Sequence, residues 1–178
     1  MTKDMGLTNA RVIKTTGSHA PDSDDVTQSE EAWSKSEECS YRSIVGRLQW
    51  LTGTRPDIQY AVKELARDSN DPTPSSWKRV KHVIKYLKHT AQYRLMFSQI
   101  LPDAPVSEID THADADWAGC PESRRSTSGF CLFVSGNLIH SASRTQGSVA
   151  MSSAESELYA LCTATSEGIF LRLSLIHI

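Results

Sequence analysis

The sequence predicts an α+β protein, with helices in its first half and a small antiparallel sheet covered by one helix in its second half. Between residues 41 and 89, apolar side chains recur every three or four positions, the period of amphipathic helices. Two runs, 129–135 and 138–144, are rich in β-branched and apolar residues and flank Gly136-Asn137, a pair typical of a two-residue type II′ hairpin. We therefore expect a small helical bundle followed by strands and a last helix.

The first forty residues, 1–40, are expected to be a mostly disordered linker. The part from Thr16 to Ser40 is rich in Ser, Asp and Glu and contains one aromatic residue, Trp33. Such a segment buries too little apolar surface to offset the entropy lost on ordering.

Three helices are predicted in residues 41–97. The first is expected over 41–51 with Gly53 as its C-terminal cap, and Pro56 suits the first turn of the second. Thr73 followed by Pro74 predicts the start of the third, which should end near His89. Their apolar faces consist of Tyr41, Ile44, Val45, Leu48 and Leu51; Ile58, Ala61, Val62, Leu65 and Ala66; and Trp77, Val80, Ile84 and Leu87.

The polar face of the third helix is strongly basic. Residues 41–97 carry eleven basic and four acidic side chains. Lysines at spacings of three, four and three form one stripe, which could neutralise nucleic-acid phosphates without reading sequence. A solvated helix face is an equally good interpretation. The stripe consists of Lys78, Lys81, Lys85 and Lys88.

The second half is expected to contain strands at 93–97 and 106–112, then the hairpin, then a helix. That helix should begin at Ser152, with Glu155 three residues later completing a capping box. Its buried side chains are expected to be Leu158, Leu161, Cys162 and Ile169.

Acidic residues of a strand and a helix predict a divalent-metal site. Asp114 lies in HADADWAGCP and Glu157 in SSAESELYAL, and a helix lying across the sheet would bring the two together. Close carboxylates repel until a cation binds, and Mg²⁺ prefers such hard oxygen ligands. Asp110 and Asp116 would share the strand face of Asp114, so spacing alone does not choose among them, whereas Glu155 is expected to serve the capping box.

Several classes of protein are disfavoured. The cysteines, Cys39, Cys120, Cys131 and Cys162, show no zinc-ligand spacing. No apolar run reaches the ~18 residues of a membrane span, and the charged start does not resemble a secretory signal. We therefore expect a cytoplasmic or nuclear protein with no membrane partner.

Four motifs resemble the Pol polyprotein of copia-type LTR retrotransposons. They are YRSIVGRLQWLTGTRPDIQYAV, SWKRVKHVIKYLKHT, DADWAGCPESRRSTSGF and MSSAESELYAL, and the likeness runs in order from about Met5 to Arg172. It implies that residues 41–97 are reverse transcriptase thumb or connection helices following a polymerase palm. Residues 106–172 would be the N-terminal half of a ribonuclease H-like domain.

The resemblance also implies an activity and its residues. Ribonuclease H cleaves the RNA strand of an RNA–DNA hybrid by two-metal hydrolysis with Mg²⁺. Asp114 matches the first metal-binding aspartate of the family and Glu157 the helix glutamate. Arg124 and Arg125 could contact phosphate, or could lie in a solvated turn. The expected partners are a hybrid or other nucleic acid and the rest of the polyprotein, in cytoplasmic virus-like particles or the nucleus.

The chain departs from the family in two respects. It has no Y-x-D-D-like polymerase centre, and no later ribonuclease H carboxylates follow Arg172. Residues 173–178, LSLIHI, resemble a translated sequencing adapter and are expected to be a foreign tail. We therefore expect the chain alone to be inactive and to bind nucleic acid through its basic helix, residues 77–89.

Overall fold

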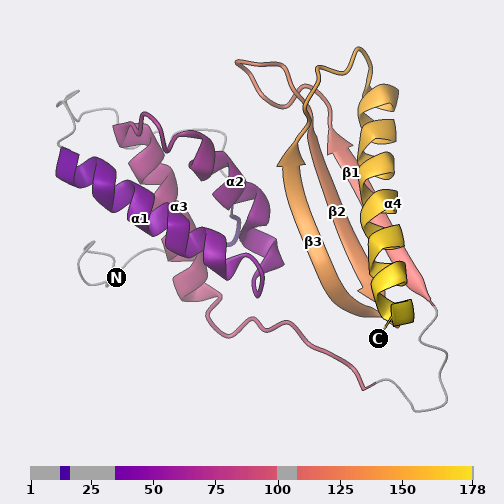
Figure 1. Cartoon of the computed structure of the whole chain (residues 1–178). Helices are drawn as coiled ribbons and strands as arrows, with labels where there is room; N and C mark the ends of the chain where they lie inside the picture. Colours follow the sequence, from indigo (N-terminus) through magenta and orange to yellow (C-terminus); the bar gives the residue numbers. More distant parts are fainter. Residues whose placement is uncertain (1–12, 17–34, 100–107, 178) are drawn as a thin grey trace. The chain divides into compact units, whose positions relative to one another are not determined.

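The computed structural model describes residues 13–16, 35–99 and 108–177, which belong to two compact units (Figure 1). One unit is Met1–Arg94 and the other is Leu95–Ile178. The first unit is helical, whereas the second contains a three-stranded sheet and one long helix. This arrangement confirms the α+β class. Within the described ranges, no helix is long and apolar enough to cross a membrane.

The first unit is built from α1 (Lys35–Leu51), η1 (Pro56–Ile58), α2 (Gln59–Arg67) and α3 (Pro74–His89). Helix α3 begins where the capping pattern predicts, whereas Pro56 begins the 3₁₀ turn η1 and α2 itself starts three residues later, at Gln59. Helix α1 starts six residues before the predicted Tyr41, inside the segment expected to be linker. Glu37 and Glu38 in its first turn favour this extension, because negative charge stabilises a helix N-terminus.

Apolar side chains from the helices of the first unit meet in one core. Tyr41, Leu48 and Val80 are fully or almost fully buried, as are Ile58 and Leu65. The core therefore uses the apolar faces that the sequence predicts. The Tyr41 hydroxyl donates to the Leu65 carbonyl oxygen at 2.8 Å, and burial is the main cause that raises the pKa of Tyr41 to about 12.

Two polar clusters fix the turns of this unit. Arg55 donates to both carboxylate oxygens of Asp57 and to the backbone and hydroxyl oxygens of Thr90, while Tyr86 donates to Asp57. The hydrogen bonds from Arg55 hold the pKa of the Asp57 carboxyl below its usual range. The cluster ties η1 to the end of α3.

The second polar cluster lies between α2 and α3. Thr73 caps α3 and forms a reciprocal capping box with Ser76, which confirms the predicted start of this helix. The Asp68 carboxylate accepts from the Ser76 hydroxyl and from Arg79. The turn is thus held by side chains from both helices.

The second unit is an antiparallel sheet in the order β1-β2-β3, with α4 lying along one face (Figure 1). The elements are β1 (Ile109–Asp116), β2 (Thr127–Val134), β3 (Asn137–Thr145) and α4 (Ser153–His177). Residues 173–177 continue α4, and the foreign origin of residues 173–178 stays a prediction.

The hairpin between β2 and β3 forms, but its turn lies one residue earlier than predicted. Ser135 and Gly136 have φ values of 48° and 75°, and Asn137 already pairs with Val134. Positive φ at both central residues is typical of type I′ rather than type II′. Asn137 is unavailable for the turn because its side-chain amide is buried and hydrogen-bonds to both backbone groups of Ser98.

The predicted strand at residues 93–97 is wrong. The structure gives this segment no strand, and Tyr93, Met96 and Phe97 are exposed. An apolar run becomes a strand only where another strand pairs with it, and none of the described strands does so here.

The predicted burial of α4 is also wrong. Its buried residues are small, namely Ser156, Ala160 and Ala164. The side chains expected in the core are exposed instead: Leu158, Leu161, Cys162 and Ile169. Small residues let the helix axis lie close to Phe130 and Leu132 of the sheet, which form the core with Ala164.

We expect Tyr41→Phe to lower the free energy of unfolding by about 1 kcal/mol at pH 7, because a buried hydrogen bond is lost. Since the folded-state pKa of Tyr41 is raised above the unfolded value near 10, its contribution is present below pH 10 and is lost as pH rises through about 12. Urea unfolding at pH 7 and between pH 10 and 12 measures both effects. The exposed Tyr93→Phe is the control. If the free energy of unfolding of Tyr41→Phe fell between pH 10 and 12 as steeply as that of the parent, the assignment of this pH dependence to Tyr41 would be contradicted.

Candidate functional site

The end of β1 lies beside the start of α4. Trp117 directly follows β1, and its indole nitrogen donates to the carbonyl oxygen of Ala150 at 3.1 Å. Ala150 is buried and lies three residues before Ser153, the first residue of α4. The strand that carries the predicted aspartate therefore ends next to the helix that carries the predicted glutamate.

Asp114 lies on the face of β1 that α4 does not cover. Ala113 and Thr111 pair with Phe130 and Leu132, and these β2 side chains pack beneath the helix. Because side chains alternate along a strand, Asp114 points to the opposite face together with its even-numbered neighbours. Asp114 therefore does not face the covered core of the sheet, and its convergence with Glu157 at the end of the strand stays a prediction.

Glu157 lies on the flank of α4 that faces β1. Each residue turns the helix by about 100°, so Glu157 is a quarter turn from the buried Ser156 and close in direction to Gly168. A Cβ atom at Gly168 would lie 3.3 Å from the hydroxyl of Thr111 in β1. Glu157 is partly buried on this flank. Asp114 and Glu157 thus lie on different sides of edge strand β1, and we call the region around them, where β1 ends and α4 begins, the acidic corner.

The alternative acids have other positions. Glu155 accepts from the Met151 amide and the Tyr159 hydroxyl, and its own amide donates to Ser152 Oγ. It therefore serves the helix start, as predicted. The Asp116 carboxylate fills the space where a side chain at Gly119 would lie. Asp110 is four residues from Asp114, about 13 Å along the strand and away from the corner.

The corner offers few metal ligands. No group of three or more His, Cys, Asp or Glu side chains suited to a metal ion occurs within the described ranges. Asp114 and Glu157 are both hard oxygen donors, the type that Mg²⁺ prefers. Their assignment as ligands stays a prediction.

Gln146 positions the helix start, and sequence reasoning missed it. Its amide nitrogen donates to Ser128 Oγ and to the carbonyl oxygen of Ser156, both at 2.9 Å. Ser156 directly precedes Glu157, so this bond fixes the turn that carries the glutamate. A glutamine just after a strand gave no sequence signal. The Gln146 Oε1 is buried and accepts no hydrogen bond from the described residues.

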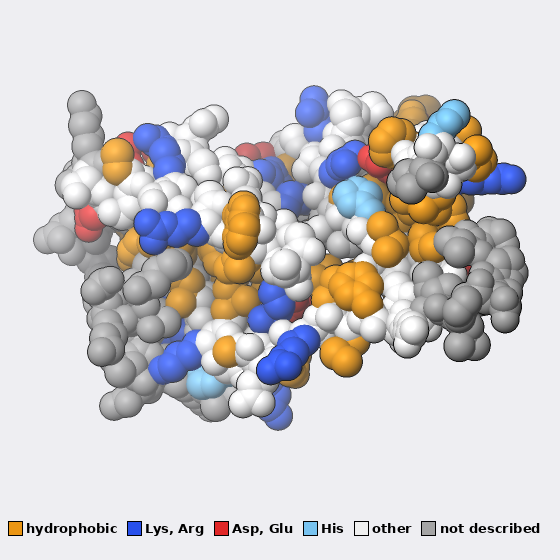
Figure 2. Space-filling model, turned by 60° about the horizontal axis from the view of Figure 1, so that its bottom comes forward, with side chains coloured by type: hydrophobic (Ala, Val, Ile, Leu, Met, Phe, Trp, Pro, Cys, Tyr) orange, Lys and Arg blue, Asp and Glu red, His pale blue; other side chains and the backbone are white. Residues whose placement is uncertain are grey.

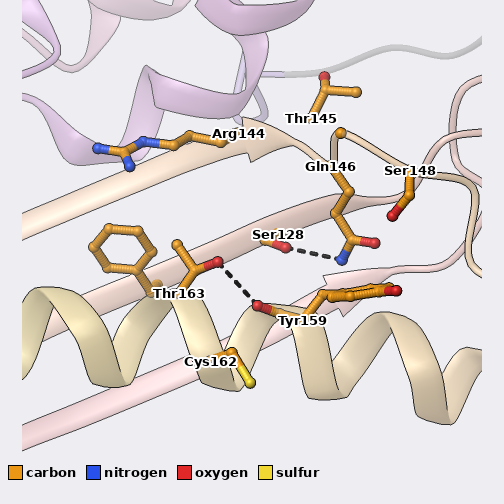
Figure 3. A pocket seen from close by; sticks show the side chains of 10 residues that line it. Ser128, Arg144, Thr145, Gln146, Ser148, Tyr159, Cys162 and Thr163 are labelled. Carbon is orange, nitrogen blue, oxygen red and sulfur yellow. Dashed lines mark hydrogen bonds between the residues drawn. The ribbon is translucent and has the colours of Figure 1, made fainter.

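A pocket of about 460 Å³ lies between the β2–β3 hairpin and α4, beside Gln146 (Figure 3). Ser128 and Arg144 line it from the sheet, and Tyr159 and Cys162 line it from the helix. It is on the β3 side of α4, whereas Glu157 is on the β1 side. The pocket is therefore separate from the acidic corner.

Arg124 and Arg125 lie in the turn that follows β1. Both are exposed, and the turn is closed by backbone hydrogen bonds from Arg124 to Cys120 and from Cys120 to Arg125. The turn is at the end of the sheet where β1 finishes. It therefore places two positive charges at the same end as the acidic corner.

The lysine stripe of α3 faces away from the core of the first unit. Lys78 and Lys88 are exposed and Lys81 and Lys85 partly so, whereas Val80, Val83 and Ile84 are buried. Arg79 is engaged by Asp68. The face shown in Figure 2 carries many basic and few acidic side chains.

No family model matches the sequence, and no solved structure matches it either. The chain is 41% identical over 132 residues to the secreted RxLR effector protein 161 of Plasmopara viticola, covering 74% of this chain and 90% of that protein. It is 39% identical over 127 residues to an uncharacterised mitochondrial protein of Arabidopsis thaliana, covering 71% of this chain and 51% of that protein. It is 35% identical over 127 residues to the retrovirus-related Pol polyprotein from transposon RE2 of Arabidopsis thaliana, covering 71% of this chain and 8% of that protein.

We expect Gln146→Ala to destabilise the second unit by about 1–3 kcal/mol, because the Ser156 carbonyl oxygen and the Ser128 hydroxyl of β2 lose their shared donor. Urea unfolding compared with the exposed Gln49→Ala, which should stay within about 0.5 kcal/mol of the parent, measures the loss. Equal stability of the two variants would show that Gln146 does not hold the helix start.

Proposed function

Because the chain belongs to the Pol polyprotein family of copia-type LTR retrotransposons, we propose that residues 106–172 act in the polyprotein as part of a ribonuclease H module. This module hydrolyses the RNA strand of an RNA–DNA hybrid. Residues 41–97 supply thumb or connection helices in the same proposal. The chain spans about half of the mitochondrial relative and a tenth or less of the Pol relatives.

The observation that carries the proposal is the joint between the end of β1 and the start of α4. Trp117 bonded to Ala150 and Gln146 bonded to Ser156 hold this joint from two sides. The joint brings the end of the strand that carries Asp114 next to the start of the helix that carries Glu157, which supports a shared role for these acids.

The donor chemistry of the corner suits magnesium, but the number of donors is small. Mg²⁺ takes about six oxygen ligands and keeps several of its waters when few carboxylates are present. Asp114 and Glu157 would hold the ion, and a bound ion supplies an activated water and stabilises a leaving oxygen. In our proposal further ligands come from other parts of the polyprotein, so the chain alone hydrolyses little or nothing.

The remaining residues of the corner bind the substrate backbone. Arg124 and Arg125 would neutralise phosphates beside the acids, which reduces the repulsion between carboxylates and nucleic acid. A hybrid is recognised through phosphates and 2′-hydroxyl groups rather than through base edges. The module therefore acts with little sequence preference.

In a Pol polyprotein that carries this region, Asp114→Asn and Glu157→Gln are each expected to lower hybrid cleavage more than about 100-fold, since a metal ligand is lost. Asp110→Asn, on the same strand face but farther from the start of α4, is the matched control and should keep the parental rate. Cleavage of a labelled RNA–DNA hybrid in Mg²⁺ measures the three rates. Parental activity in Asp114→Asn would refute the assignment.

A second candidate function for the isolated chain is nucleic-acid binding through α3. The observation that favours it is that Lys81 and Lys85 lie on the outer side of α3, whereas their neighbours Val80 and Ile84 are buried in the core. Four lysines on one face of a helix can neutralise several phosphates, which gives binding that falls with salt. This function requires neither a metal nor the acidic corner.

The double variant Lys81→Ala/Lys85→Ala is expected to weaken duplex binding and to reduce the slope of log affinity against log salt by about 2, one unit for each lost phosphate contact. Fluorescence anisotropy at several salt concentrations measures the slope. Arg47→Ala, an exposed basic residue of α1, is the control. A slope that drops equally in both variants would mean that binding is diffuse rather than located on α3.

A further inference from the structure

The outer face of α4 is apolar although nothing within the described chain covers it. Leu158, Leu161 and Ile169 are 59%, 53% and 55% exposed. They lie opposite Ser156, Ala160 and Ala164, which face the sheet. A helix that buries only small residues and exposes its large apolar ones is typical of an element with a second packing partner.

Five exposed residues on this side of α4, three apolar and two polar, are spaced symmetrically along the helix. The intervals between successive residues of this stripe are three, four, four and three positions. The spacing is therefore the same in both chain directions from the middle residue, Thr165. The residues of this outer stripe are Leu158, Leu161, Thr165, Ile169 and Arg172.

A symmetric stripe is complementary to a second copy of itself in antiparallel orientation. With a two-fold axis at Thr165, Leu161 of each copy lies opposite Ile169 of the other. At the ends of the stripe, Leu158 lies opposite Arg172. A two-fold interface requires this kind of self-complementarity, because one surface must serve both partners.

The charges at the ends of the stripe agree with the same pairing. Glu157 lies one residue before Leu158, on the flank that faces β1, and carries the charge opposite to Arg172. In the antiparallel pair each Glu157 lies beside the partner's Arg172, whereas in a parallel pair it would lie beside a second Glu157. Charge complementarity therefore selects the antiparallel arrangement.

We propose that two copies of this chain associate through the outer stripe of α4, antiparallel and centred on Thr165. The largest apolar patch on a typical monomer measures about 300–600 Å², so two such patches bury roughly 600–1,200 Å² in total. Interfaces of that size are weak and reversible. The pairing lies within residues 157–172 and does not require the expected foreign tail.

Sedimentation velocity of the full chain, with a chelator present and at concentrations up to roughly 1 mM, tests the proposal. We expect a concentration-dependent shift from monomer to dimer. Leu161→Glu should raise the dissociation constant at least about tenfold, because it places a carboxylate opposite the apolar Ile169 of the second copy. Ile139→Glu is the matched control, since Ile139 is 49% exposed but belongs to β3, and it should leave the dimer unchanged.

Charge reversal tests the orientation. Glu157→Arg should weaken the dimer by opposing two arginines, and Glu157→Arg combined with Arg172→Glu should restore it. A chain that stays monomeric, or a dimer that Leu161→Glu does not weaken, overturns the proposal. Monomers that bind neutral phospholipid vesicles through the stripe would overturn it in favour of a lipid surface. All of these outcomes are read from sedimentation or vesicle binding, whereas the ribonuclease H proposal is tested by hybrid cleavage, so failure of one proposal can be told from failure of the other.

Discussion

Close packing of α4 on the sheet is the constraint on which the second unit depends. Ser156, Ala160 and Ala164 present little side chain, so the helix axis can approach Phe130 and Leu132 until their surfaces interlock. Once small residues occupy this face, the helical period forces the large apolar side chains outward. The same rotation places Glu157 on the flank beside β1. The position of Glu157 at the acidic corner and the exposure of the apolar stripe therefore both follow from packing the small-residue face of α4 on the sheet.

Polar contacts between distant residues then fix what apolar packing leaves free. Apolar surfaces can slide past each other at small cost, whereas a buried hydrogen bond holds one atom at one distance. Gln146 fixes the first turn of α4, and Trp117 fixes the end of β1. In the first unit, Arg55 does the same by joining η1 to the end of α3. Each of these side chains connects the end of one element to another element.

The helices of the first unit were predictable because their apolar stripes, proline and cap residues agree with one another. Local signals sufficed there, and the core uses Tyr41, Leu48 and Val80 as expected. The sequence also pointed to the acids of the candidate site, but not to Gln146 or to the separation of Asp114 from the covered face. A hydrogen bond from a side chain to a distant carbonyl leaves no periodic trace in the sequence.

The sequence by itself determined the fold class, the helical turn that begins at Pro56, the start of α3 after Thr73, and the membership of the Pol family. These depend on local stereochemistry or on shared motifs. Only the tertiary structure decided that residues 93–97 form no strand, that the hairpin turns at Ser135-Gly136, and that α4 buries its small residues. Pairing and packing depend on which surface lies opposite, and residue types alone do not specify the partner. For α4, the apolar period predicted that large side chains would be buried, whereas the face that packs against the sheet is the one with small residues, because it allows the closest approach.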